Sequence, residues 1–155
     1  MELTPLIFKN ILSALDDGGH SERVSRLVYN LSQEVGLDKN TSNLFSLASR
    51  YHDIGKLMIL RHLLESVQLL SPGERKMIER HISYGHSMLT KYRGTEAETA
   101  RTIITTHHEH WGGNGYPRGL RGEEIPLCGR ITAVCDVYDA LTSDRPYRSA
   151  WPTDM

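Results

Sequence analysis

Two adjacent histidines, His107-His108, run into a glycine-rich stretch that ends in Gly115-Tyr116-Pro117. Histidine is the commonest metal ligand in proteins, and adjacent imidazoles beside a flexible loop favour metal ligation next to a substrate. A second pair with the same chemistry, His52-Asp53, lies far upstream. These two motifs indicate a metal site that is assembled from distant parts of the chain.

Further residues of the metal-binding type lie on five different predicted helices or at their ends. Any one of them alone would more often be a surface residue or a hydrogen-bonded core residue, so the joint pattern carries the argument. Two metals about 3.5–4 Å apart activate water and stabilise the leaving oxygen in phosphoester hydrolysis. The set suffices for two metals if one carboxylate bridges them, and its donors suit Fe, Mn, Zn or Ni. It comprises His20, His52, Asp53, His81, His107, His108 and Asp136.

The composition excludes several other classes of protein. The chain has 155 residues and a formal net charge of −1, which predicts one domain with no bulk attraction to nucleic-acid polymers or anionic membranes. No apolar run approaches the roughly 18–20 residues of a membrane span, and the N-terminus lacks the features of a signal peptide. Cys128 and Cys135 do not form a CxxC motif. We therefore expect free thiols in a reducing compartment, and a cytoplasmic protein.

Helical spacing of apolar residues dominates the chain, and no hairpin signal stands out. Thr4-Pro5 is typical of a helix start. A second helix is predicted from about His20, and Asn40 or Thr41 is expected to cap a third that ends near Gly55. The second helix is expected to bury Val24, Leu27, Val28, Leu31 and Val35.

Later start signals complete the pattern. Ser71-Pro72-Gly73-Glu74 predicts a capping box and one helix that continues through His81 to Leu89. Another helix is expected from Thr95 to His107-His108, and a last one from Ile125-Pro126. The predicted fold class is all-α, a single helical bundle, and such bundles build metal sites from side chains on facing helices.

In the order and completeness of its motifs, the chain resembles the HD-GYP family, a branch of the HD-domain metal-dependent phosphohydrolases. The resemblance covers roughly residues 16–150. Family members hydrolyse cyclic di-GMP, a bacterial second messenger. The matching motifs are His20-Ser21-Glu22-Arg23-Val24, His52-Asp53-Ile54-Gly55-Lys56, His81 with Gly85, His107-His108-Glu109, Gly115-Tyr116-Pro117, Arg130-Ile131, Asp136, Ala140-Leu141 and Arg145-Pro146-Tyr147-Arg148.

The resemblance implies a role for each matching residue. Asp53 would bridge two divalent metals and act with Lys56 as a catalytic residue. One metal would be held by His20, His52, Asp53 and Asp136, and the other by Asp53, His81, His107 and His108. The substrate phosphates and nucleotide would be bound by Lys56, Tyr116, Arg145 and Arg148.

The chain departs from the family pattern at three places. Some members use a glutamate for a third metal where this chain has Asp16, so a third metal is an option. Gly112 replaces an aspartate that the family usually has in the loop, which we expect to loosen the loop without removing a ligand. The domain, residues 1–155, is expected to lack the family's usual C-terminal helices, either as a truncated piece or as one that completes its core in a homodimer.

These observations predict a metal-dependent phosphodiesterase that hydrolyses cyclic di-GMP to pGpG, with a second cleavage to GMP as an option and iron as the first expectation for the metal. Two alternatives stay open. One is a module that binds cyclic di-GMP without hydrolysis, or that recruits a signalling partner through the Gly115-Tyr116-Pro117 loop. The other is an HD-type phosphohydrolase that acts on another nucleotide.

Overall fold

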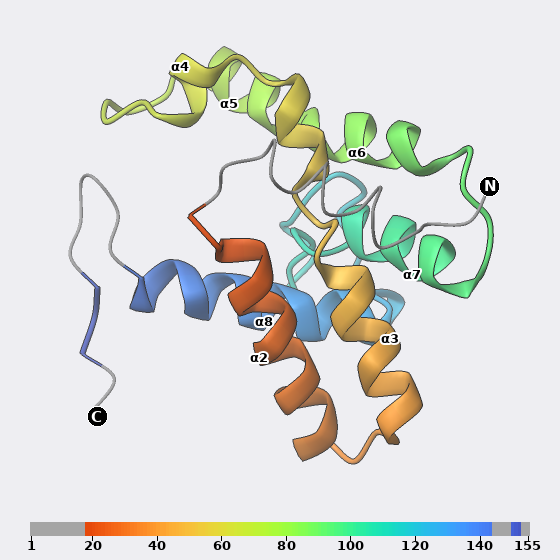
Figure 1. Ribbon diagram of the computed structural model, residues 1–155. Helices are drawn as coiled ribbons and strands as arrows, with labels where there is room; N and C mark the ends of the chain where they lie inside the picture. Colours follow the sequence, from red (N-terminus) through yellow and green to blue (C-terminus); the bar gives the residue numbers. More distant parts are fainter. Residues whose placement is uncertain (1–17, 144–149, 153–155) are drawn as a thin grey trace.

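Helices joined by turns and loops make up the computed structural model, which describes residues 18–143 and 150–152 (Figure 1). No β-strand occurs within these residues, where an isolated bridge joins Gly112 to Arg121, so the predicted all-α class is confirmed. The helices are α2 (His20–Glu34), α3 (Lys39–Ser49), the 3-10 turn η1 (Ile54–Met58), α4 (Arg61–Leu64), α5 (Pro72–Glu79), α6 (His81–Leu89), α7 (Thr95–Ile104), the 3-10 turn η2 (Gly122–Glu124) and α8 (Leu127–Thr142). The predicted helix start at Thr4-Pro5 lies outside the described residues.

The second predicted helix is present as α2, and its apolar face is buried at Val24 and Val28. The prediction that Val35 is buried was wrong, because the helix ends at Glu34 and Val35 is 54% exposed. Gly36 follows with a φ of 88°, a left-handed conformation that reverses the chain direction after a helix.

The start of α3 differs from the prediction. Asp38, not Asn40 or Thr41, is the N-cap, and its carboxylate accepts hydrogen bonds from the backbone N–H groups of both of those residues. The helix ends at Ser49, before the turn that carries His52-Asp53. The third helix therefore exists as predicted, but both of its boundaries were wrong by a few residues.

The predicted capping box at Ser71 is confirmed, with the Ser71 hydroxyl accepting from the Glu74 N–H and the Glu74 carboxylate accepting from the Ser71 N–H. The single helix that was expected to follow is divided at Arg80 into α5 and α6, so His81 lies in the first turn of a new helix. Similarly, α7 ends at Ile104, and His107-His108 lie in the turn after it.

The hydrophobic core has two connected parts. The larger joins α3, η1, α6 and α7 around buried residues such as Tyr51, Leu89 and Ile104. The smaller lies between α2 and α8, and Phe45 packs against both parts. The helices that carry the candidate metal ligands are therefore fixed relative to one another by shared apolar contacts.

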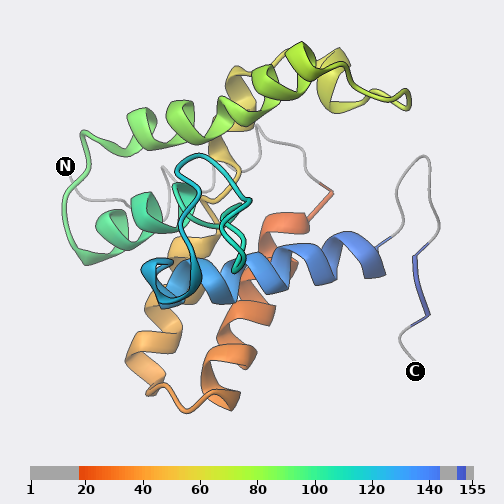
Figure 2. The same cartoon turned by 180° about the vertical axis from the view of Figure 1, so that it is seen from behind.

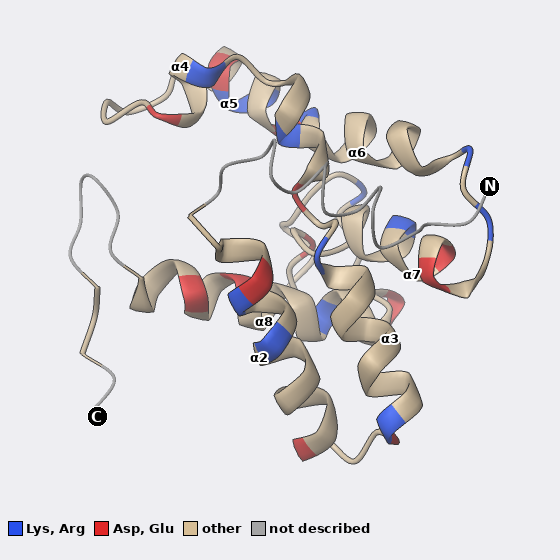
Figure 3. Ribbon diagram, viewed as in Figure 1, with Lys and Arg blue, Asp and Glu red and all other residues tan. Residues whose placement is uncertain are grey.

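Figures 1 and 2 show how these helices surround the site. Helices α2 and α3 run side by side and α8 crosses them, while α6 and α7 lie on the other side of the turn after α3. The α4–α5 segment projects beyond this body, and the reverse view shows the loop that joins α7 to α8. Acidic and basic residues are interspersed along the helices (Figure 3). None of the helices in the described part of the chain is long and apolar enough to cross a membrane.

One glycine brings two of the site's elements into backbone contact. A Cβ atom at Gly55 would lie 1.8 Å from the carbonyl oxygen of His81 and 2.6 Å from the backbone nitrogen of Gly85. Only glycine lets backbones approach this closely. The turn that carries Asp53 is thereby held directly against the start of α6, where His81 lies.

Candidate metal centre

The Asp53 carboxylate is the midpoint of the site. Its Oδ1 atom lies 3.6 Å from His81 Nε2 and 3.9 Å from His107 Nε2. Its Oδ2 atom faces the opposite way, 3.4 Å from His52 Nε2 and 3.9 Å from His20 Nε2. Asp53 is 3% exposed, so each carboxylate oxygen faces a different set of imidazoles inside the protein.

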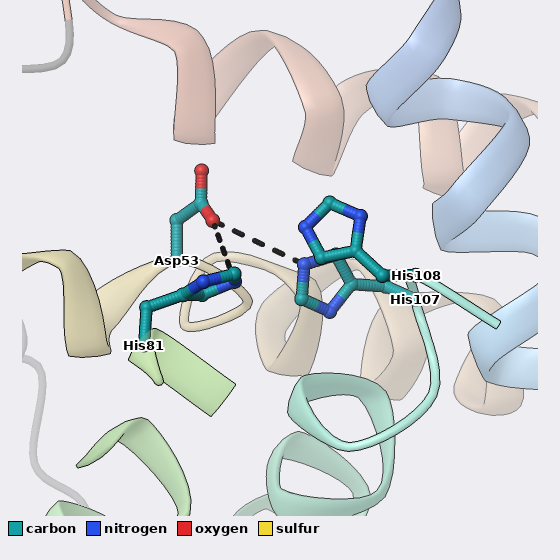
Figure 4. A group of neighbouring side chains, drawn as sticks. All are labelled: Asp53, His81, His107 and His108. Atoms are coloured by element: carbon teal, nitrogen blue, oxygen red, sulfur yellow. Dashed lines mark ion pairs between the residues drawn. The ribbon is translucent and has the colours of Figure 1, made fainter. Parts of the chain in front are cut away.

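Asp53, His81, His107 and His108 form what we call the second ligand group. Each offers one donor atom, and these atoms all lie within 4.8 Å of one another. Figure 4 shows the Asp53 carboxylate facing the rings of His81, from α6, and of His107, from the turn after α7. Asp53 Oδ1, His81 Nε2 and His107 Nε2 are buried without a hydrogen-bond partner among the described residues. Buried polar atoms in this condition are costly, and a metal ion would satisfy all three at once.

His20, His52 and Asp136 form the first ligand group, whose donor atoms also lie within 4.8 Å of one another. His20 Nε2 is 3.2 Å from His52 Nε2 and 3.1 Å from Asp136 Oδ1. The His52 Nε2 to Asp136 Oδ1 distance is 3.8 Å. These residues come from α2, the turn after α3, and α8, which confirms that separate helices converge here.

Hydrogen bonds to the second ring nitrogen set the tautomer of the histidines. His52 Nδ1 donates to the Ser49 carbonyl at 2.9 Å, His81 Nδ1 to the Ile78 carbonyl at 2.7 Å, and His107 Nδ1 to the Ile103 carbonyl at 3.1 Å. A carbonyl can only accept, so each Nδ1 carries a proton, and each ring in its neutral form turns the Nε2 lone pair inward.

The facing Nε2 atoms of His20 and His52 support the same conclusion. His20 Nδ1 donates to Asp139 at 2.7 Å, so both rings of this pair hold their proton on the outer nitrogen. If both rings were neutral, two lone pairs would lie 3.2 Å apart, so either a ring proton or a bound metal cation must lie between or beside these nitrogens. The donor set of nitrogens and carboxylate oxygens therefore fits divalent metals.

The two groups differ in their electrostatics. Burial lowers the pKa of His81, lowers that of His107 well below its ordinary value, and lowers the pKa of His108 to about 4. For His52, burial also opposes the charge, but Asp53 and Asp136 outweigh it and raise the pKa to about 10. Burial opposes charge on Asp53 as well, but Lys56 and His52 outweigh it and hold the Asp53 pKa well below its ordinary value.

Lys56 and Tyr116 lie beside the centre. The Lys56 ammonium, on η1, is ion-paired with Asp53 Oδ2. The Tyr116 ring stacks on the His108 ring, with centroids 4.8 Å apart and planes inclined by 23°. Both residues contact a candidate metal ligand, and their substrate roles stay predictions. Asp16, Arg145 and Arg148 lie outside the described residues.

The loop after His108 is held by its own backbone. The buried Glu109 carboxylate accepts from the N–H groups of Arg118 at 2.7 Å and Leu120 at 2.9 Å. The Tyr116 N–H donates to the His108 carbonyl at 3.1 Å. A Cβ at Gly115 would lie 2.3 Å from the His110 nitrogen, whereas one at Gly112 would meet only the Asn114 Oδ1 atom, at 3.5 Å.

Sequence reasoning missed two acidic residues that support the site. Glu109 was quoted only as part of a motif, although its carboxylate closes the loop. Asp139 was not singled out, although it is 3% exposed and holds the His20 ring. A signal was available for Asp139, because it lies three residues after Asp136 and therefore on the same side of a helix.

A family model described as "HD domain" matches residues 9–154 of the chain. The chain belongs to the HD domain family. Membership agrees with the His52-Asp53 pair at the middle of the centre and with the two groups of ligands around it. It confirms the predicted resemblance at the level of the family, and the relatives described next extend that resemblance to HD-GYP proteins.

This HD domain is similar to several curated bacterial proteins. It is 36% identical over 140 residues to "3'3'-cGAMP-specific phosphodiesterase 2" of Vibrio cholerae, covering 90% of this chain and 27% of the relative. It is 36% identical over 135 residues to "Cyclic di-GMP phosphodiesterase" of Thermotoga maritima, covering 87% and 37%. It is 38% identical over 141 residues to "Cyclic di-GMP phosphodiesterase response regulator RpfG" of Xanthomonas campestris, covering 89% and 37%. The chain thus spans between about a quarter and two fifths of the length of these relatives.

A solved structure shares the fold. The HD domain is similar to Bd1817, a HDG"Y"P protein from Bdellovibrio bacteriovorus, with a TM-score of 0.66 and 25% sequence identity. The match covers 79% of this chain and 40% of the other. The helical arrangement around the centre is therefore that of an HD-GYP protein.

Proposed function

We propose that this HD domain is a metal-dependent phosphodiesterase that hydrolyses cyclic di-GMP to pGpG and then to GMP. The observation that carries the proposal is the Asp53 carboxylate, whose two oxygens face two separate groups of imidazoles. A carboxylate in that position is suited to bridge two metals, which is the arrangement used for in-line displacement at phosphorus. The names of similar proteins from T. maritima and X. campestris support the choice of substrate.

The residues of the centre divide the work. Bound metals would supply Lewis acidity toward water and the phosphate. The first ligand group with Asp53 would hold one metal, and the second ligand group the other, with iron as the first candidate and Mn, Zn or Ni as alternatives. Lys56 would neutralise charge on the scissile phosphate, and Tyr116 would flank the nucleotide. Arg145 and Arg148 would bind phosphate oxygens, and Asp16 would ligate a third metal.

A second candidate substrate is 3'3'-cGAMP. The observation that favours it is the 36% identity to a V. cholerae protein named as specific for that dinucleotide. The metal centre acts on the phosphodiester, which both dinucleotides share, so the base-recognising surface decides between them. A cytoplasmic location, a homodimer and partner recruitment through the Gly115-Tyr116-Pro117 loop stay predictions.

The proposal is tested by incubating the protein, loaded with Fe²⁺ or Mn²⁺, with cyclic di-GMP, 3'3'-cGAMP and a linear dinucleotide in separate reactions. We expect pGpG and then GMP from cyclic di-GMP, resolved by chromatography. Faster loss of 3'3'-cGAMP would favour the second candidate. Calorimetric binding of cyclic di-GMP without any product would contradict the enzyme and support a binding module.

A further inference from the structure

His20 is held differently from three other histidines of the centre. His52, His81 and His107 each donate their Nδ1 proton to main-chain carbonyls. His20 instead donates Nδ1 to a carboxylate, Asp139 Oδ2, at 2.7 Å. Asp139 is 3% exposed, so this pair is shielded from solvent. A carboxylate that accepts the Nδ1 proton raises the basicity of Nε2, and so its strength as a metal ligand, more than a neutral carbonyl does.

Asp139 is itself held by an arginine. Arg23 Nε donates to Asp139 Oδ1 at 2.6 Å and Arg23 Nη2 donates to Oδ2 at 3.0 Å, a two-pronged contact. The remaining Arg23 nitrogen, Nη1, donates to the Gly18 carbonyl at 2.8 Å. Fork-to-fork pairs of this kind fix direction as well as distance.

This network joins two helices at the metal centre. His20 and Arg23 lie in the first turns of α2, and Asp136 and Asp139 lie three residues apart on α8. The same turn of α8 therefore presents one carboxylate to each nitrogen of the His20 ring. Asp139 takes Nδ1, and Asp136 Oδ1 lies 3.1 Å from Nε2.

We propose that Asp139 is a positioning residue of the centre, which fixes the tautomer and direction of His20, and that Arg23 fixes Asp139. Asp139 touches neither metal nor substrate in this role, because His20 lies between. The inference rests on the part of the proposed function in which the first ligand group holds a metal. It predicts that this subsite alone depends on a charged partner behind its histidine.

The test is a calorimetric titration of the metal-free protein with Mn²⁺, comparing wild type with Asp139→Asn. Asparagine keeps the shape but removes the charge that faces His20 and Arg23. We expect one of the two binding sites to weaken by about 10–100-fold, while the other keeps its affinity. The matched control is Glu22→Gln. Glu22 lies in the same turn of α2 as His20, but its carboxylate is paired with Arg50, away from the metal ligands. Both metal affinities of this variant should equal those of the wild type.

A second variant and a spectrum separate positioning from plain helix tethering. Arg23→Lys keeps the positive charge but loses the two-pronged contact, and we expect a smaller loss, of about threefold to tenfold, at the same site. With Co²⁺ as the probe, Asp139→Asn should alter the visible absorption of one cobalt per chain. A lower thermal midpoint with unchanged affinities and an unchanged spectrum would overturn the proposal, as would a wild-type protein that binds no metal near His20. Wild-type protein that binds two metals but turns over no dinucleotide would defeat the proposed enzyme and leave the affinities to decide this inference.

Discussion

The two ligand groups use the same residue types, but the protein shifts the histidine pKa values in opposite directions in the two groups. In the second group, burial holds the pKa of His108 at about 4 and also lowers the values for His81 and His107, so these rings are neutral near pH 7. In the first group, Asp53 and Asp136 outweigh burial and raise the pKa of His52 to about 10. The second group is ready to ligate at neutral pH, whereas the first must give up a proton to a metal.

The difference teaches that burial alone does not decide the state of a histidine. His52 and His107 are both buried, and their rings meet edge to face with centroids 5.2 Å apart. What separates them is the distance to carboxylates, because His52 lies near both Asp53 and Asp136 while His107 approaches Asp53 only at 3.9 Å. The neighbouring carboxylates therefore raise the pKa of His52, although its ring touches that of His107, whose pKa is lowered by burial.

The largest effect is expected from a substitution that disrupts both ligand groups at once. Asp53 is the side chain whose two oxygens face both groups among the described residues, so we expect Asp53→Ala to lose both metals and turnover to fall by at least about a thousandfold. Metal analysis of the purified protein and a cyclic di-GMP assay measure these. Asp136→Ala is the control, because it belongs to the first group only and should leave one metal per chain. Normal turnover in Asp53→Ala would show that the centre is misassigned.

A backbone change should damage the second group alone. In Gly115→Ala the new Cβ would lie 2.3–2.6 Å from backbone atoms of His108, Glu109 and His110, so the loop must move. We expect a loss of stability of about 2–4 kcal/mol, measured by urea unfolding, and weaker metal binding near His108. The His20 subsite should keep its affinity. Equal weakening of both subsites would argue that the two groups are not separable.

The pH dependence of metal affinity should also separate the groups. Below pH 10 a metal must displace a proton from His52, so affinity at the first group should fall by up to about tenfold for each unit of pH lost. The second group should show a flat profile between about pH 6.5 and pH 8.5, because its rings are already neutral there. Calorimetry with Mn²⁺ at several pH values measures both, and a flat profile for both subsites would remove the contrast.

The same pKa shifts determine whether the metal-free protein gains or loses stability as the pH falls. The lowered pKa values of His81, His107 and His108 give stability that is present above pH 6.5 and lost as the pH falls below it, toward about 4 for His108. His108 alone accounts for about 3 kcal/mol of this loss. The raised His52 value acts oppositely, giving stability that is full below pH 6.5 and lost as the pH rises through about 10. Urea unfolding at pH 6.5 and pH 4.5 should therefore show a less stable protein at the lower pH.

The smallest expected effect concerns Gly112, where the family usually has aspartate. Among the described residues, a Cβ there meets only the Asn114 side chain at 3.5 Å, which is ordinary contact, and Glu109 already closes the loop through two backbone N–H groups. Gly112→Asp should therefore change the free energy of unfolding by less than about 0.5 kcal/mol and leave both metal affinities unchanged. A marked gain in affinity at the second group would show that the glycine weakens it.

The sequence was enough to predict the helical class, and the residues that the family resemblance assigns to two metals are those that the structure brings together in two groups. Apolar spacing indicated α2 and α3, and the joint pattern of histidines and aspartates, more than either adjacent pair alone, favoured metal chemistry. The supporting residues were harder to find because their roles depend on contacts across the fold. Asp139 holds a histidine that lies 119 residues earlier in the chain, and Asp38 displaced the predicted caps because it precedes them by two and three residues. The opposite charge states of His52 and His107 depend on distances to carboxylates, which no spacing rule supplies.

The stack of Tyr116 on His108 has a thermodynamic consequence. The ring that would flank the nucleotide rests, at 4.8 Å, on a ring that would hold a metal. If metal binding fixes His108, it also fixes the surface against which Tyr116 packs. The dinucleotide then binds to a Tyr116 side chain that is already ordered, so its binding has a smaller entropy cost. Linkage makes the effect reciprocal, so a bound dinucleotide must raise the metal affinity of this subsite by the same factor. A shortage of metal would then weaken substrate binding as well as slow the reaction.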